Sequence, residues 1–174
     1  MTFLGIIAFL DPPKPDAKEA IHGLYDAGVA VKVISGDAPV VVEHVCKLVG
    51  MKVGEQNAVT GSDLEKMSEE ELSAVVEKKD IFARLSPMQK QRVVDALRKN
   101  GHVVGYMGDG VNDAPSLHDA DVGISVDNAT DVAKASADII LLEKSLTVIL
   151  NGIYEGRRIY GNILKYMKMA LSGN

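Results

Sequence analysis

The segment Gly108-Asp109-Gly110-Val111-Asn112-Asp113 places two carboxylates and one amide on a short turn, directly after the apolar run His102–Met107. Such a run is typical of a buried parallel strand, and Gly108 and Gly110 allow a sharp turn with close backbone approach. The three polar side chains are therefore expected at the strand's carboxyl end, where their oxygens would suit a hard cation such as Mg²⁺. This chemistry is magnesium-assisted phosphoryl transfer. By itself the segment also fits an ordinary Asp/Gly turn.

Polar residues follow two other expected strands. Ser35-Gly36-Asp37 and Arg84 each come at a strand's end, and Lys90 lies near the start of the helix expected from Pro87. Ser35 offers a hydroxyl to a phosphoryl oxygen, and Lys90 offers a cation where the helix dipole already favours anions. Each feature alone is more often a turn or a solvated lysine. Together they favour a phosphate site at one edge of a sheet.

The elements that must position these residues alternate between strand-like and helix-like patterns. Alternation of this kind predicts an α/β fold, with a parallel sheet covered by helices on both faces, over residues 1–144. Asp16 with Glu19, and Ser68 with Glu71, resemble capping boxes at helix starts. The expected strands are Phe3–Leu10, Val29–Ser35, Ile81–Arg84, His102–Met107, Asp121–Val126 and Asp138–Leu142, and the expected helices run from Asp16 to Gly28, from Pro39 to Gly50, briefly after Ser68, and from Pro87 to Lys99.

Residues 145–174 form a separate unit in this interpretation. Apolar residues from Leu146 to Leu171 recur at helical spacing, which predicts one long helix of about seven turns. Basic residues such as Arg157 and Lys165 lie among Tyr and Met, as in a stalk next to a membrane. A terminal helix that docks on its own core explains the pattern equally well.

Composition narrows the classes of function. The chain has 174 residues and a formal net charge of −5, which argues against a nucleic-acid partner because no cluster of Lys and Arg is in excess. Cys46 is the only cysteine, so a disulfide framework and a thiolate zinc site are excluded. The apolar start lacks the features of a signal peptide, and no uninterrupted apolar run reaches the ~18 residues of a membrane span. The chain itself is expected to be soluble.

Taken in order, the motifs resemble those of the haloacid dehalogenase superfamily, and within it the phosphorylation domain of P-type cation-transporting ATPases. The resemblance extends over Met1–Asn174, and two flanking stretches, 137–146 and 161–166, look most like magnesium-transporting members. It implies a Rossmann-like parallel sheet and a long C-terminal helix that leads toward a membrane span. The motifs that carry it are Leu10-Asp11-Pro12-Pro13-Lys14, Ile34-Ser35-Gly36-Asp37, Phe82–Pro87 with Lys90, and Asp109–Pro115.

The resemblance also implies site roles, with Mg²⁺ and ATP as cofactors. Asp109 would ligate the catalytic magnesium and Asp113 would support it. The other implied contacts are those of Lys90 and Asn112 with the transferring phosphoryl group, of Ser35, Gly36 and Asp37 with phosphate and nucleotide, and of Arg84 with the nucleotide.

One departure from the family concerns the nucleophile. The family's aspartate lies in Asp-Lys-Thr-Gly-Thr at the end of the central strand, and no such sequence occurs in this chain. Asp11 is a poor substitute, because Pro12 and Pro13 provide no N–H groups to hold a phosphate. Covalent phosphoryl transfer needs an activated carboxylate, so the isolated chain is expected to be inactive.

The missing strand would lie between the strand that ends at Ser35 and the one that ends at Met107. Its absence would leave two open edges, which invite pairing. We expect the chain either to pair these two strands directly or to borrow a strand through exchange or self-association. The implied partners are ATP and the rest of a parent ATPase, namely its nucleophile strand, nucleotide-binding domain and transmembrane domain, at the cytoplasmic face of the cell membrane. A soluble haloacid dehalogenase-like phosphatase and a noncatalytic binding or regulatory module remain as alternatives.

Overall fold

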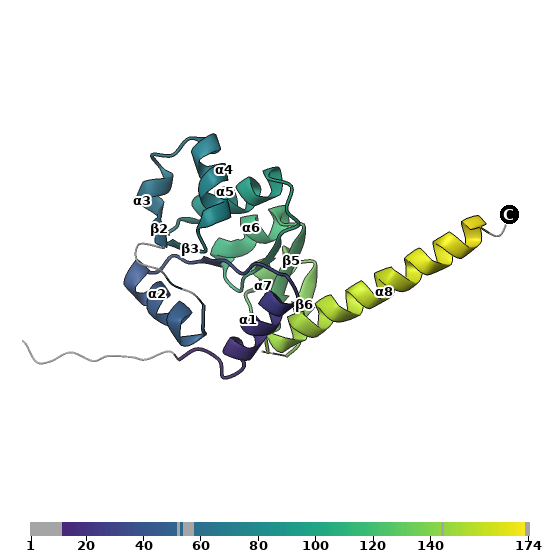
Figure 1. Ribbon diagram of the computed structural model, residues 1–174. Helices are drawn as coiled ribbons and strands as arrows, with labels where there is room; N and C mark the ends of the chain where they lie inside the picture. The colour runs from purple at the N-terminus through teal and green to yellow at the C-terminus, as the bar shows by residue number, and fades with distance from the viewer. Residues whose placement is uncertain (1–11, 52, 54–57, 144, 173–174) are drawn as a thin grey trace, which may run out of the picture.

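The computed structural model describes residues 12–51, 53, 58–143 and 145–172. Helices and parallel strands alternate along it, as the sequence predicts (Figure 1). The expected strand Phe3–Leu10 lies outside the described residues. In chain order the elements are α1 (Ala17–Asp26), β1 (Val33–Ile34), α2 (Pro39–Leu48), β2 (Ala58–Thr60), α3 (Gly61–Leu64), α4 (Glu69–Lys78), β3 (Ile81–Ala83), α5 (Pro87–Lys99), β4 (Gly105–Met107), the 3₁₀ turn η1 (Val111–Asp113), α6 (Ala114–Asp119), β5 (Val122–Val126), α7 (Asp131–Ala135), β6 (Ile139–Leu141) and α8 (Thr147–Ser172).

The described strands form two separate three-stranded sheets. One has the order β1-β3-β2 and the other the order β4-β5-β6. Val33 pairs with Ile81 in the first sheet, and Tyr106 pairs with Gly123 in the second. Among the described residues β1 pairs only with β3, and β4 only with β5, so the first of the two alternatives, direct pairing of β1 with β4, is not observed. The sheet is interrupted where the family's central strand was expected.

Helices cover both faces of the first sheet. Successive side chains of β3 point to opposite faces and so pack against different helices. Ile81 and Ala83 pack with residues of α1 and α2, whereas Phe82 packs with residues of α4 and α5. All three β3 residues are fully buried, so β3 is the centre of this half. The expected arrangement of helices on both faces is confirmed here.

The second sheet has its own core, and two features join it to the first. Tyr106 of β4, Leu117 of α6 and Leu141 of β6 belong to one cluster, which also contains Val94 of α5. Because Val93, the neighbour of Val94, belongs to the core of the first sheet, α5 packs on both halves. Ile34 of β1, which packs against both clusters, is the second link.

Most predicted helix ends agree with the structure. Helix α5 spans Pro87–Lys99 as expected, and Ser68 caps α4 with Glu71 in the expected capping box. The capping box predicted for Asp16 and Glu19 is wrong, since the Asp16 side chain makes no cap bond to α1. Strand β2 (Ala58–Thr60) was not anticipated, because its three residues occur in a polar stretch that favours turns and helix.

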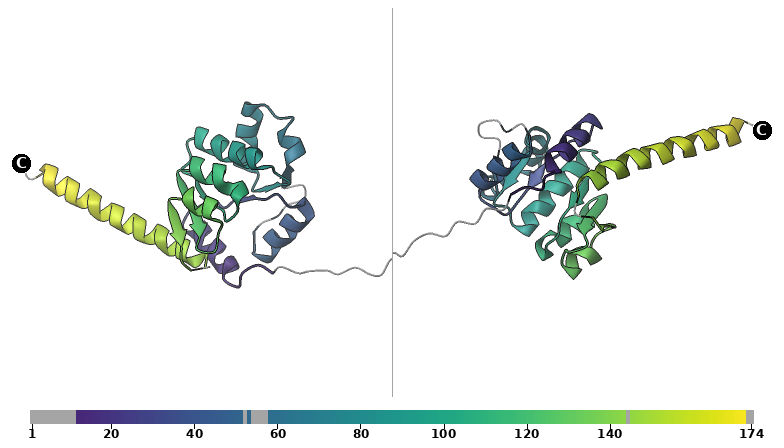
Figure 2. Two further views of the ribbon diagram at one scale, coloured as in Figure 1. Left: turned by 180° about the vertical axis from the view of Figure 1, so that it is seen from behind. Right: turned by 90° about the horizontal axis from the view of Figure 1, so that it is seen from below.

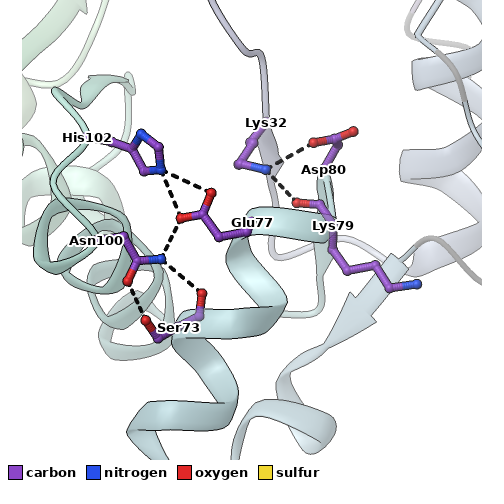
Figure 3. Close-up of polar contacts among 7 residues, drawn as sticks. All are labelled: Lys32, Ser73, Glu77, Lys79, Asp80, Asn100 and His102. Atoms are coloured by element: carbon purple, nitrogen blue, oxygen red, sulfur yellow. Dashed lines mark hydrogen bonds and ion pairs between the residues drawn. The ribbon is translucent and has the colours of Figure 1, made fainter.

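A polar network fastens α4 to its surroundings at the amino-terminal end of the first sheet (Figure 3). The amide nitrogen of Asn100, at the end of α5, donates to the Ser73 carbonyl at 2.9 Å and also to Glu77, which in turn contacts His102 at 2.8 Å. Lys32, just before β1, donates to Asp80, just before β3, at 3.0 Å. The Lys32 contact joins the starts of β1 and β3, and the other contacts join α4 to the end of α5.

Helix α8 projects well beyond the rest of the molecule (Figures 1 and 2). It spans Thr147–Ser172, and none of its residues is buried. Its first part packs against other elements, as with Leu150, which lies against Gly23 of α1. The predicted long C-terminal helix is therefore present. Within the described residues, no helix combines the length and apolar character needed to cross a membrane.

Candidate phosphoryl-transfer site

A cleft of about 470 Å³ opens where the carboxyl ends of β1 and β4 face each other. Ile34 and Ser35 line it from the first sheet, and Tyr106 with the following turn lines it from the second. In parallel α/β folds, ligands collect at such strand ends, particularly where neighbouring strands separate. The complete lining is Lys14, Ile34, Ser35, Lys90, Tyr106, Met107, Gly108, Asp109, Asp113, Val126 and Asn128.

A closely packed ion pair between Lys90 and Asp113 forms one wall of this cleft. The Lys90 Nζ lies 2.7 Å from Oδ1 of Asp113, and each side chain is only 13% exposed. The first turn of α5 positions Lys90, because Ser86 caps this helix and Pro87 provides a preformed first residue. Gly108 is needed opposite, since a Cβ there would lie 2.5 Å from the Cβ of Asp113.

The surroundings of Asp113 keep it ionised. Burial disfavours its charge, but the hydrogen bond and positive charge of Lys90 outweigh burial and, with two further donors, hold the pKa of Asp113 below its usual range. The donors are the Tyr106 hydroxyl at 2.9 Å and the Gly110 N–H at 3.3 Å. Burial, together with the charge of Asp113, raises the pKa of Tyr106, so its hydroxyl remains a donor.

We expect Asp113→Ala to lower the free energy of unfolding by about 3 kcal/mol, because it leaves a largely buried ammonium without its partner. The contribution of Asp113 is complete above its unfolded pKa of about 3.9 and is lost as pH falls through its lower folded value. Urea titrations of parent and variant should therefore differ at pH 7 and converge near pH 2. Asp131→Ala, which alters an exposed pair with Lys134, should cost less than about 1 kcal/mol. Equal losses in the two variants would refute the buried-pair interpretation.

Asp109 presents an uncommitted carboxylate to the cleft. Its backbone carbonyl accepts the Thr130 N–H at 3.0 Å, which fixes the turn to the start of α7. Ser125 of β5, which is fully buried, donates to the Gly108 carbonyl at 3.0 Å and supports the turn from beneath. Within the described part of the chain, the Asp109 side chain is exposed and has no hydrogen bond or ion pair. It is therefore free to bind a ligand in the cleft.

The loop that follows β1 is folded onto the end of β3. Ser35 Oγ accepts from the Asp37 N–H at 3.1 Å and donates to the Asp37 carboxylate at 2.9 Å, which makes a tight turn. The Arg84 N–H donates to the Asp37 carbonyl at 2.9 Å, and the N–H of Leu85 donates to the Ser35 carbonyl at 3.0 Å. Arg84 has a φ of 55°, a left-handed conformation that is uncommon for a residue other than glycine.

The cleft brings together half of the residues proposed from the sequence. Ser35, Lys90, Asp109 and Asp113 line it. The remaining four lie beside it: Gly36 and Asp37 in the loop after β1, the exposed Arg84 after β3, and the exposed Asn112 on the turn η1.

Two polar residues that line the cleft were not assigned a site role from the sequence: Tyr106 and Asn128. Asn128 could have been found, because it follows β5 and so satisfies the same strand-end rule that selected Ser35 and Asp109. Nothing in the sequence marked Tyr106 as a site residue, because a tyrosine within an apolar strand is expected to pack in the hydrophobic core.

The donors available in the cleft fit Mg²⁺. This ion is commonly held by one or two carboxylates, and phosphate oxygens and waters complete its octahedron. Asp109 and Asp113 are two carboxylates on one turn, and the Asp109 side chain is uncommitted. Among the described residues there is no group of three or more His, Cys, Asp or Glu side chains that could hold a metal ion by itself.

The geometry and the sequence comparisons together place the chain in a family. Residues 2–121 match the family of haloacid dehalogenase-like hydrolases, and the chain belongs to that family. Over its whole length it is homologous to P-type ATPases, magnesium-transporting ones among them.

Three relatives illustrate this similarity. A magnesium-transporting ATPase, P-type 1, of Salmonella typhimurium is 55% identical over 174 residues, which is all of this chain and 19% of that protein. The human calcium-transporting ATPase type 2C member 1 is 38% identical over 99% of this chain and 19% of its own length. The crystal structure of a zinc-transporting PIB-type ATPase in its E2.Pi state superposes with a TM-score of 0.73 at 26% identity, covering 93% of this chain and 22% of the other. The chain thus spans about a fifth of these relatives.

Proposed function

We propose that this chain provides the magnesium- and phosphate-binding part of the phosphorylation site in a P-type ATPase that transports cations, Mg²⁺ in particular. In such an enzyme, ATP hydrolysis proceeds through an aspartyl-phosphate. The observation that carries the proposal is the cleft between β1 and β4, where Ser35, Lys90, Asp109 and Asp113 converge. Full-length similarity to a magnesium-transporting ATPase supports the choice of ion.

Each side chain has a role that its surroundings allow. Asp109 ligates Mg²⁺ through its free carboxylate, which offsets the charge of the phosphoryl group. Asp113 supports that site by orienting Lys90, whose ammonium stabilises the phosphoryl oxygens together with Asn112. The loop Ser35-Gly36-Asp37 contacts phosphate and nucleotide, and Arg84 contacts the ATP nucleotide. Mg²⁺ supplies positive charge to the transferring group, and these residues hold both in place.

The attacking carboxylate comes from elsewhere in this proposal. The sequence contains no Asp-Lys-Thr-Gly-Thr, and β1 and β4 both face the cleft without pairing to each other. A strand that carries the nucleophile would enter between them, from the rest of the parent ATPase or by exchange with another molecule. The isolated chain is then inactive, and its partners are ATP and the nucleophile strand, nucleotide-binding domain and transmembrane domain of the parent.

In this proposal the chain consists of two functional regions. Residues 1–144 form a partial phosphorylation domain, and residues 145–174 form a stalk-like helix that leads toward a membrane span. We propose that the cleft lies at the cytoplasmic face of the membrane. The exposed apolar and basic residues of α8 support a stalk over a helix docked on its own core.

A phosphatase assay tests the proposal against a soluble haloacid dehalogenase-like phosphatase. The purified 174-residue chain with Mg²⁺ should not hydrolyse p-nitrophenyl phosphate. Addition of a peptide with the strand and Asp-Lys-Thr-Gly-Thr should produce magnesium-dependent turnover, and Lys90→Ala should remove it. Sustained hydrolysis by the chain alone would contradict the proposal. Binding of Mg²⁺ or phosphate by calorimetry, with no turnover when the peptide is added, would favour a noncatalytic binding module.

A further inference from the structure

Asp16 directly precedes α1, in the position of a helix cap, but its side chain bonds to the start of a different helix, α8. Its backbone is helical, with φ −85° and ψ −8°, and its carboxylate makes no bond to the start of α1. Instead, Oδ2 accepts a hydrogen bond from the Ser145 hydroxyl and another, at 3.0 Å, from the Leu146 N–H. The carboxylate is thus used at the start of α8, 129 residues away in sequence from Ser145.

A carboxylate suits this position for two reasons. The first N–H groups of a helix have no partners within the helix, and the helix dipole favours negative charge there. Ser145 adds a second link, because its Oγ accepts the N–H of Thr147 at 3.2 Å. The hydrogen bond from Ser145 is the main reason that the pKa of Asp16 is lowered, so the group is anionic at neutral pH.

Helices α1 and α8 run side by side from this point (Figure 1). Leu150 lies against Gly23, where a Cβ would come within 2.3 Å of its Cδ2. About one turn further along α1 and two turns further along α8, the Arg157 Nη1 donates to the carbonyl of Ala27, the residue after α1, at 2.6 Å. The contacts follow the same order in both helices, so these helices are parallel. Beyond Arg157 the helix is mostly exposed, and the full length of its 26 residues is about 39 Å.

The start of α8 also touches both halves of the interrupted sheet. Leu146 packs against the core of the first sheet, and Val148 and Ile149 pack against the core of the second. Lys14, two residues before Asp16, lines the cleft, and its carbonyl accepts the Ala17 N–H at 3.1 Å. Asp16 therefore lies on a short path from the wall of the cleft to the root of the projecting helix.

We propose that Asp16 is a positioning residue that latches α8 to the loop 14–16, so that the wall of the cleft and the projecting helix move as one body. The latch consists of the Asp16 carboxylate, the Ser145 hydroxyl and the Leu146 N–H. It goes beyond the phosphoryl-transfer function, because it needs neither Mg²⁺ nor phosphate to operate.

The direction of α8 can be measured with two spin labels on the complete chain. Exposed Lys165 on α8 and exposed Ala74 on α4 are changed to cysteine and labelled, while buried Cys46 is protected from the reagent. Double electron–electron resonance should give one narrow distance in the parent. In Asp16→Ala, a tilt of ~10° over the ~27 Å from the root to Lys165 should shift or broaden it by about 5 Å.

Matched variants separate the latch from a general loss of stability. Asp16→Asn keeps an oxygen acceptor and should restore most of the narrow distribution. Glu19→Ala removes a negative charge from the same turn of α1 without touching α8, and it should leave the distance unchanged. If Asp16→Ala gives the parent distribution while remaining folded, the latch is refuted.

A reciprocal experiment works from the side of α8. Ser145→Ala removes one of the two donors to Asp16 and leaves the cleft residues intact. Hydrogen exchange at the Ala17 N–H, which is bonded to Lys14, should accelerate severalfold if α8 and the cleft loop are one body. Unchanged exchange there, with faster exchange confined to the first turn of α8, would show an ordinary helix cap and overturn the proposal. This test also covers the case in which Asp16→Ala fails to fold.

Discussion

Asp109→Ala should abolish phosphoenzyme formation in a chimera in which this chain replaces the matching segment of the Salmonella magnesium-transporting relative. The two segments are 55% identical over 174 residues, so the exchange preserves the fold. The carboxylate of Asp109 has no other partner among the described residues, which leaves it free to ligate Mg²⁺. Without that divalent charge, the negative transferring group is not offset, and phosphorylation from labelled ATP should fall by at least about a hundredfold.

Two variants show whether this loss is specific to the ligand. Asp109→Asn keeps the size of the side chain and removes its charge, so it should lose nearly as much phosphorylation as Asp109→Ala. Asp131→Ala removes an exposed carboxylate that does not line the cleft, and it should phosphorylate at close to the rate of the unmodified chimera. Phosphoenzyme at the parental level in Asp109→Ala would refute the assignment of Asp109 to the metal.

Local sequence patterns predicted the parts of the fold that are decided locally. The cap at Ser86 and the proline after it fixed α5 at Pro87–Lys99, because these residues act on the helix that they begin. The rule that polar residues gather at the carboxyl ends of parallel strands correctly placed Ser35 and Asp109 in one cleft, and the start of the helix that follows β3 added Lys90. The same rule extended to β5 would have included Asn128.

The wrong predictions concern residues whose partners are far away in the chain. Asp16 and Glu19 have the spacing of a capping box, but tertiary contacts with Ser145 and Leu146 recruit the Asp16 carboxylate to α8. Spacing along one helix carries no information about a donor on another. Direct pairing of β1 with β4, one of the two alternatives for the gap in the sheet, is absent from the described residues for a similar reason. That alternative treats two open edges as free to meet, whereas α5 and Ile34 set where the two cores pack.

Gly123→Ala should be among the most destabilising single-methyl changes in this chain. A Cβ at Gly123 would lie 2.5 Å from the carbonyl oxygen of Leu117 and 3.4 Å from the Cα of Ala137. Both are backbone atoms, so no side chain can rotate away, and α6 or the segment before β6 must shift. We expect a loss of about 3 kcal/mol in the free energy of unfolding, measured by urea denaturation.

Gly105→Ala is the matched control for this prediction, because Gly105 lies on the adjacent strand β4 and a Cβ there would meet only the Val122 carbonyl at an ordinary 3.9 Å. Its effect should stay within about 1 kcal/mol of zero. The strain in Gly123→Ala should also reach the cleft, since β5 carries Ser125, which holds the Gly108 carbonyl, and leads into Asn128. Equal stability of the two variants would mean that α6 and β5 can separate at little cost in free energy. The close backbone packing of these two elements would then not be what holds the turn at Asp109 in place.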